Sequence, residues 1–287
     1  MVDIGEGPMQ VEFQASMRIF GTGLDFDMIS HTLGFQPSEI HRHGDLGILK
    51  PYSEDMWRVD SPLPRTDSLD AHLAWLRQVL SPHYDFLRTL ARRFTLSSYC
   101  GVGVDDNHCT FQISAEALKI FLEMGTPLNL SIVMTGVPEP TTNALPESTS
   151  QQPEVGFDGC RQESSASLQI IGSGLDISHI SATLTLTPSK THRPSHFHRE
   201  AGEGKAPSWS FWSGMPRSKE LDAHLKRLEA VLLPHIDFLR SLPTNAKLLF
   251  SCDIATENDH GGVEISPEAL RIPVQLDVPM EFNVCLI

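Results

Sequence analysis

The sequence predicts an α+β fold made of two copies of one domain, each a mostly antiparallel sheet with helices on one face. Three observations support this. Most of the chain repeats internally, each copy shows the pattern order β-α-β-α-β-β-α-β, and a stretch rich in Pro, Ser and acidic residues separates the copies. The expected boundaries are 10–134 for the first repeat, 135–163 for the linker and 164–287 for the second repeat. A chain of 287 residues, 40% of them hydrophobic, can form two ordinary cores.

The duplication rests on matches at a nearly constant offset. Trp57 and Trp209 lie 152 positions apart. The same offset, or 151 upstream, relates three longer motifs: Gly-x-Gly-Leu-Asp at 21–25 and 172–176, Leu-Asp-Ala-His-Leu at 69–73 and 221–225, and Pro-His-x-Asp-Phe-Leu-Arg at 82–88 and 234–240. Because chance does not keep one offset through so many matches, the chain contains a tandem duplication.

Local patterns place the elements within each copy. Rough alternation of apolar and polar residues predicts strands, and Asp25 and Asp176 are expected to cap short helices. The elements expected in the first copy are a strand (Val11–Phe20), a helix ending at Gly34, a strand (Met56–Val59), a long helix, strands at Phe94–Val104 and His108–Ser114, a helix (Glu116–Met124) and a strand (Leu128–Met134).

The long helix has the clearest periodicity in the chain. Leucines at positions 69, 73, 76 and 80, and again at 221, 225, 228 and 232, form one apolar stripe for burial. Pro82 and Pro234 remove an amide donor, so the helix is expected to kink or restart there. His72 and His224 lie at the flank of the stripe and are interpreted as boundary residues with satisfied hydrogen bonds.

Charge and cysteine content indicate the kind of partner and the cellular compartment. The formal net charge is −14, and no run of Lys and Arg exceeds the pair Arg92-Arg93. An acidic surface repels phosphate backbones, so nucleic acid is not expected as a partner; a basic protein would suit this charge better, although many proteins are acidic for solubility alone. No apolar run is long enough to span a membrane, and the first residues do not resemble a signal peptide. The five cysteines are widely spaced, which predicts reduced thiols and a cytoplasmic location.

The motifs resemble a bacterial family known as domain of unknown function 4279. That pattern combines G-x-x-L-D, L-G, P-S, a basic residue with G-D, a lone tryptophan and a leucine helix. The first copy carries it at Gly21, Leu24-Asp25, Leu33-Gly34, Pro37-Ser38, Arg42 to Asp45 and Trp57, whereas the second copy lacks the Gly-Asp pair. The resemblance implies the fold and a bacterial, intracellular setting. It supplies no catalytic residues.

Histidine-rich loops are the predicted metal sites. The first loop carries His41, His43 and Asp45, and the second carries His192, His196 and His198. Imidazole and carboxylate groups suit zinc, so these loops are candidates for weak binding of a divalent metal, although a solvated loop is the preferred interpretation. No other cofactor is expected.

Arg42 and Arg193 occupy corresponding loops and are candidate ligand-binding residues, because a guanidinium can bind a carboxylate in a bidentate manner. Each could instead pair with an internal acid such as Asp45. Trp57 and Trp209 follow these loops and are candidate ligand contacts, with burial in the core as the alternative.

Two classes of function therefore remain open. The preferred interpretation is a non-catalytic binding or interaction protein whose two repeats imitate a homodimer, with a bacterial immunity or regulatory role as one possible context. The alternative is an enzyme, or a protein that binds a small molecule or metal. Its site would lie at the His/Arg loops or in the cleft between the repeats.

Overall fold

The computed structural model describes residues 10–47, 50–135, 162–192 and 206–287. In the first repeat the elements are β1 (Val11–Gly21), α1 (Phe26–Leu33), β2 (Glu39–His41), β3 (Asp55–Asp60), α2 (Leu69–Leu80), the 3₁₀ turn η1 (Ser81–His83), α3 (Tyr84–Leu90), β4 (Thr95–Val104), β5 (His108–Ile113), α4 (Ala115–Met124) and β6 (Leu128–Met134). This confirms the predicted order and adds the short strand β2.

The second repeat has the same order. Its elements are β7 (Gln162–Ile171), α5 (Ile177–Leu184), β8 (Lys190–His192), β9 (Ser208–Trp212), α6 (Leu221–Leu232), η2 (Leu233–His235), α7 (Ile236–Arg240), β10 (Lys247–Thr256), β11 (His260–Ile265), α8 (Arg271–Leu276) and β12 (Met280–Leu286). Asp25 and Asp176 cap α1 and α5 by accepting a hydrogen bond from the amides of Met28 and His179, both at 2.9 Å, as predicted. The leucine stripes of α2 and α6 are buried.

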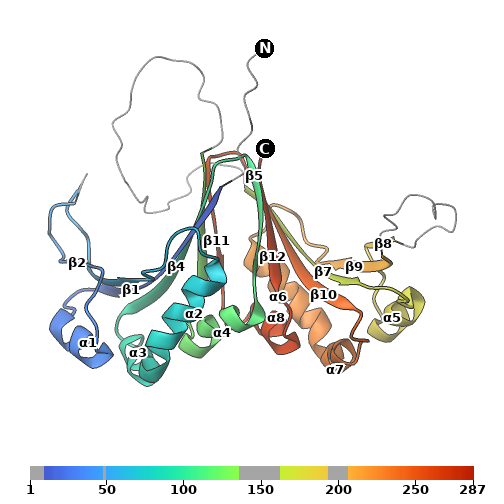
Figure 1. The fold of residues 1–287 in the computed structure, drawn as a ribbon, viewed down its shortest axis with the longest axis horizontal. Helices are drawn as coiled ribbons and strands as arrows, with labels where there is room; N and C mark the ends of the chain where they lie inside the picture. Colours follow the sequence, from blue (N-terminus) through green and yellow to red (C-terminus); the bar gives the residue numbers. More distant parts are fainter. Residues whose placement is uncertain (1–9, 48–49, 136–161, 193–205) are drawn as a thin grey trace, which may run out of the picture.

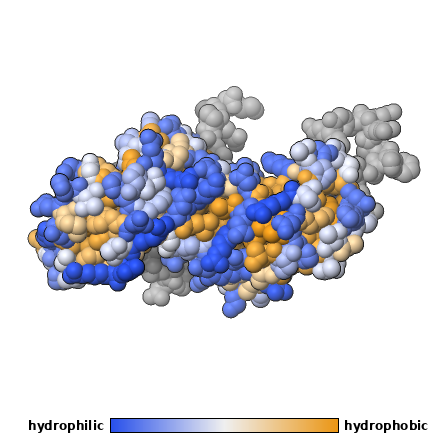
Figure 2. All heavy atoms as spheres, turned by 90° about the horizontal axis from the view of Figure 1, so that it is seen from below, coloured by the Kyte–Doolittle hydropathy of each residue, from blue (hydrophilic) through white to orange (hydrophobic). Residues whose placement is uncertain are grey.

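Two six-stranded sheets form the molecule, with the helices on one side of them (Figure 1). The strand orders are β11-β6-β4-β1-β3-β2 and β5-β12-β10-β7-β9-β8. The pairs β4–β6 and β10–β12 are parallel and the others are antiparallel, so each sheet is mostly antiparallel, as predicted. Seen from the helix side, hydrophilic residues alternate with apolar areas (Figure 2). Leu233, the first residue of η2, is 47% exposed.

The two repeats exchange one strand each. Strand β5 of the first repeat pairs with β12 in the second sheet, and β11 of the second repeat pairs with β6 in the first sheet. Strand β5 alternates exposed and buried residues, and its Cys109, Phe111 and Ile113 face the core. The sheets therefore do not coincide with the repeats in sequence, and one hydrophobic core extends through both.

No helix within the described ranges is long and apolar enough to cross a membrane. The cysteines in those ranges are unpaired: Cys100, Cys109 and Cys252 are buried, and Cys285 is exposed. Burial raises the pKa of the Cys109 thiol to about 11, which makes this thiol a poor nucleophile.

Candidate functional site

The predicted loop of the first repeat is held together by its own backbone and acids. Asp45 accepts a hydrogen bond from the amide of Arg42 at 2.7 Å. The Arg42 guanidinium donates to the carbonyl of Leu24 at 3.1 Å and lies 4.3 Å from the ring centre of Phe26. Arg42 thus fastens the loop to the start of α1. A role for it in ligand binding stays a prediction.

The histidines of this loop do not form a metal site with a third ligand among the described residues. His41 stacks on Tyr52 with ring centres 3.5 Å apart, and His43 is exposed. His192, in β8, is also exposed. Within the described ranges there is no group of three or more His, Cys, Asp or Glu that could hold a metal ion. Arg193, His196 and His198 lie outside the described residues.

The two tryptophans are part of the core. Trp57 and Trp209 are both 0% exposed. Their indole N–H groups donate to the hydroxyls of Ser30 and Ser181 at 3.1 and 3.0 Å. A ligand contact by either ring stays a prediction, and it would require the core to open.

Asp55, which the sequence did not single out, is the residue that organises the loop. Its carboxylate accepts hydrogen bonds from the amides of Gly23, Leu24 and His43 at 2.7, 2.9 and 2.8 Å, and the residue is 4% exposed. The Gly-x-Gly turn therefore presents its amides to an internal carboxylate. The His43 amide, followed by those of Leu24 and Gly23, lowers the pKa of Asp55 despite its burial.

Replacing this carboxylate with an amide should destabilise the fold in a pH-dependent way. Because the folded-state pKa is lowered, the ionised Asp55 contributes stability above its unfolded pKa of about 3.9, and this contribution is lost as the pH falls through the folded pKa. We expect Asp55→Asn to cost about 2–3 kcal/mol in urea unfolding at neutral pH, and less in acid.

Asp45→Asn is the matched control, because Asp45 is exposed and accepts one loop amide. Its expected cost is below about 1 kcal/mol. Equal costs for the two variants, or a cost of Asp55→Asn that does not shrink in acid, would contradict the role given to Asp55.

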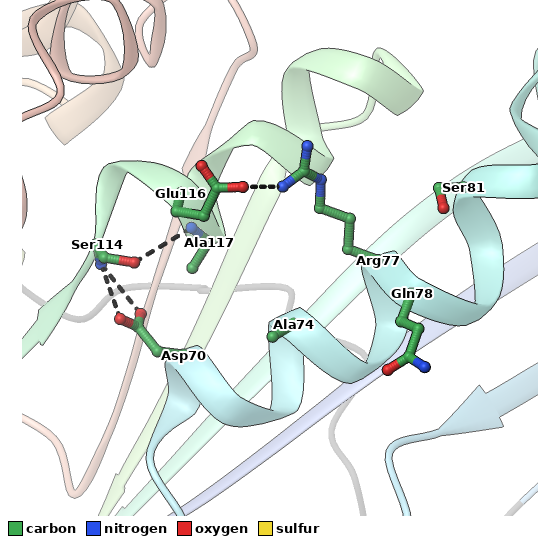
Figure 3. A pocket seen from close by; sticks show the side chains of 8 residues that line it. All are labelled: Asp70, Ala74, Arg77, Gln78, Ser81, Ser114, Glu116 and Ala117. Carbon is green, nitrogen blue, oxygen red and sulfur yellow. Dashed lines mark hydrogen bonds and ion pairs between the residues drawn. The ribbon is translucent and has the colours of Figure 1, made fainter.

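A cavity of about 460 Å³ lies between α2 and α4 (Figure 3). Its charged groups are already paired. Asp70 accepts from the amide of Ser114 at 3.0 Å, and Arg77 pairs with Glu116 and, at 2.6 Å, with Glu123. In the second repeat Asp222 accepts from the amide of Ser266 in the same way. These hydrogen bonds and ion pairs along the cavity connect α2 to α4 and its N-cap.

A smaller cavity of about 220 Å³ has a different character. It lies where β3 ends and the chain continues beside β1: the Ser61 amide donates to the carbonyl of Ala15, and the amide of Phe13 donates to the carbonyl of Arg65. Its polar lining includes Ser16, Arg18, Arg58, Asp60, Ser61 and His72. We call this cavity the arginine pocket.

The register of the strands brings two arginines together in this pocket. Ala15, Met17 and Ile19 of β1 face the core, so Ser16 and Arg18 point to the opposite face of the sheet, away from the helices. Arg18 is directly opposite Arg58 in the β1–β3 ladder. Like charges directly opposite each other destabilise a sheet, so this pair needs nearby negative charge.

Part of that negative charge comes from the protein itself. Arg58 donates to Asp60 at 2.9 Å and lies 2.7 Å from Glu39. Arg18 lies 4.2 Å from the ring centre of Tyr99, and burial together with Arg58 lowers the pKa of its guanidinium. An arginine remains charged under such a shift. The pocket therefore holds two partly buried guanidinium groups with acidic and polar neighbours.

Comparison with protein families identifies the two repeats. The model of a family described as a domain of unknown function (DUF4279) matches residues 11–135 and 162–285. The chain belongs to this family. No curated protein matches the chain. The tandem arrangement of DUF4279 domains, inferred above from the internal offsets, is thereby confirmed.

The second DUF4279 copy lacks the arginine pair. The residues of its β7–β9 ladder that correspond to Arg18 and Arg58 are Gln169 and Ser210, which also face each other. Trp212, 48% exposed, stands where the first copy has Asp60. The arginine pair is thus present in the first copy and not in the second, even though both copies have the same strand register.

His72 differs from the expectation for a boundary residue. It is 0% exposed, so it lies in the core and the predicted boundary position is wrong. Burial lowers the pKa of His72, although the nearby Pro64 carbonyl and Asp67 favour the charged ring. The imidazole therefore lines the pocket in its neutral form at pH 7.

Proposed function

We propose that this protein is a non-catalytic binding protein that recognises a carboxylate with the arginine pocket of its first repeat. The observation that carries the proposal is the pair Arg18 and Arg58, which face each other in register in a cavity, where the second repeat has Gln169 and Ser210. An anion placed between two guanidinium groups offsets their repulsion and accepts directed hydrogen bonds.

The non-catalytic part of the proposal is supported by the chemistry of the pocket. Arg58 is engaged by two acids, and His72 has no carboxylate partner within the described residues to orient it as a base. The hydroxyls of Ser16 and Ser61 have no hydrogen-bonded base within the described residues that would activate them as nucleophiles. The second repeat contributes β11 to the sheet of the first repeat, so in this proposal the second repeat acts as a scaffold.

The test is thermal denaturation of the full chain with sodium acetate, glycolate, succinate or phosphate. We expect at least one of these carboxylates to raise the Tm, because a ligand that binds only the folded state stabilises it. The double variant Arg18→Gln/Arg58→Ser, which carries the residues of the second repeat, should lose this shift. Its own Tm without ligand is the reference for each shift, because Arg58→Ser also removes the ion pairs with Asp60 and Glu39.

Arg92→Gln is the matched charge control, because Arg92 is exposed and does not line the pocket. It should keep the shift in Tm. If no anion changes the Tm of the native chain, or if the double variant responds as the native chain does, the arginine pocket is not an anion site.

A further inference from the structure

The open face of the second sheet, which is turned away from the helices, carries an exposed tryptophan (Figure 1). Trp209 of β9 faces the core, so Trp212, three residues further along the strand, points to the opposite face. Trp212 is 48% exposed. Because tryptophan combines a large apolar ring with one polar N–H group, an exposed ring on a sheet is a favourable contact for a ligand.

The strand register places serines around Trp212. Ser167 of β7 is directly opposite Trp212, and Ser251 of β10 is directly opposite Ser167. Ser210, two residues before Trp212, points to the same open face. Ser167 and Ser210 are only 5% and 8% exposed, and their hydroxyls make no hydrogen bond within the described residues. Two nearly buried hydroxyls without partners indicate a ligand that can donate and accept hydrogen bonds.

The first repeat has different residues at these positions, although its strand register is the same. The corresponding residues are Asp60 for Trp212, Ser16 for Ser167, Arg58 for Ser210 and Tyr99 for Ser251. Long side chains therefore cover this part of the first sheet, whereas serines leave the neighbourhood of the ring low in the second sheet. We call the surface formed by Trp212, Ser167, Ser210 and Ser251 the tryptophan site.

The acids beside the tryptophan site disfavour an anionic ligand. Glu281 is directly opposite Ser251, and Asp253 follows Ser251 on the same face. Both carboxylates are hydrogen-bonded to neutral side chains, and Lys190 lies at the far edge, opposite Ser210. A ligand without charge avoids repulsion from the two acids. A second copy of the chain, packed face to face, would bring the same acids towards each other, which disfavours a homodimer through this surface.

We propose that the tryptophan site binds a neutral disaccharide, with one pyranose ring stacked on Trp212. The C–H groups on one face of a pyranose ring pack against an aromatic ring, and the hydroxyls at its rim can donate to and accept from serine hydroxyls. Neighbouring strands are about 4.8 Å apart, so the row from Trp212 through Ser167 to Ser251 covers about 10 Å. Two linked pyranose rings fit that length. This site is separate from the arginine pocket and does not depend on it.

The experiment is isothermal titration of the full chain with cellobiose, maltose and N,N′-diacetylchitobiose, and with sorbitol as a polyol that has no ring. We expect at least one disaccharide to bind and sorbitol not to bind. Trp212→Asp, which carries the residue of the first repeat, should weaken this binding at least about tenfold, because the aromatic contact is lost. Trp212→Phe keeps an aromatic ring and should retain most of the affinity.

Leu233→Ala is the matched control, because Leu233 is about as exposed as Trp212 but belongs to η2, between helices α6 and α7. It should bind the sugar as the native chain does. If none of the three disaccharides binds, or if Trp212→Asp binds them as tightly as the native chain, the proposal is wrong and the arginine pocket is unaffected.

Two further outcomes would also overturn the proposal. Loss of sugar binding in Arg18→Gln/Arg58→Ser, with binding kept in Trp212→Asp, would place the sugar in the arginine pocket. Light scattering that finds a dimer of the native chain and a monomer of Trp212→Asp would show that a second copy covers this face.

Discussion

The chain divided into two polypeptides, 1–150 and 151–287, should reassemble into one complex. Each half lacks one strand of its own sheet, because β5 lies beside β12 and β11 lies beside β6. The exchanged strand buries Cys109, Phe111 and Ile113, which would otherwise be exposed to water. The contact is apolar, so the complex should withstand high salt.

The first fragment alone should form a homodimer. Its β5 can occupy, in a second copy, the place beside β6 that β11 fills in the intact chain, because the repeats share one strand order. Size-exclusion chromatography with light scattering distinguishes a monomer, a homodimer and a mixed complex. A monomeric fragment that is fully folded and does not bind the other half would show that β5 can fold back onto its own sheet.

The exchange could not be predicted from the sequence, although the strands were. The alternation of apolar and polar residues marks β5 as a strand but does not say to which sheet it belongs. The short connection 105–107 between β4 and β5 is typical of a hairpin. That pairing is excluded in the structure because β1 and β6 occupy both sides of β4.

The features of the fold that could be predicted depend on sequence patterns within a single helix or strand. The leucine spacing placed α2, and Asp25 placed the start of α1, since both depend on residues three or four positions apart. The arginine pocket was not predicted because Arg18 and Arg58 are separated in sequence and meet only through the strand register. The sequence did contain a signal, because alignment of the two copies places Arg18 against Gln169 and Arg58 against Ser210.

The side chain of Phe111 is where the exchange joins the two halves most directly. Its ring stacks on Phe282 of β12 with centres 5.2 Å apart, and it meets the edge of Phe13 of β1 at 5.8 Å. It is 7% exposed. The ring therefore lies between the first strand of one repeat and the last strand of the other.

Removing this ring should destabilise both repeats together. We expect Phe111→Ala to lower the free energy of unfolding by about 3–5 kcal/mol, the usual cost of emptying an aromatic site in a core. Because one core extends through both sheets, hydrogen exchange should speed up in β1 and in β7 to a similar extent. Urea unfolding followed by circular dichroism gives the magnitude, and exchange measured by mass spectrometry gives the distribution.

Phe111→Val is the matched control, since the corresponding residue of the exchanged strand β11 is Val263. Valine keeps an apolar, branched side chain at the position, so its cost should be clearly smaller than that of alanine. If Phe111→Ala loosens only the sheet that contains β5 and leaves β1 protected, the two halves unfold separately. The exchange would then be a connection between two independent domains, and the second repeat could not serve as the scaffold for the arginine pocket.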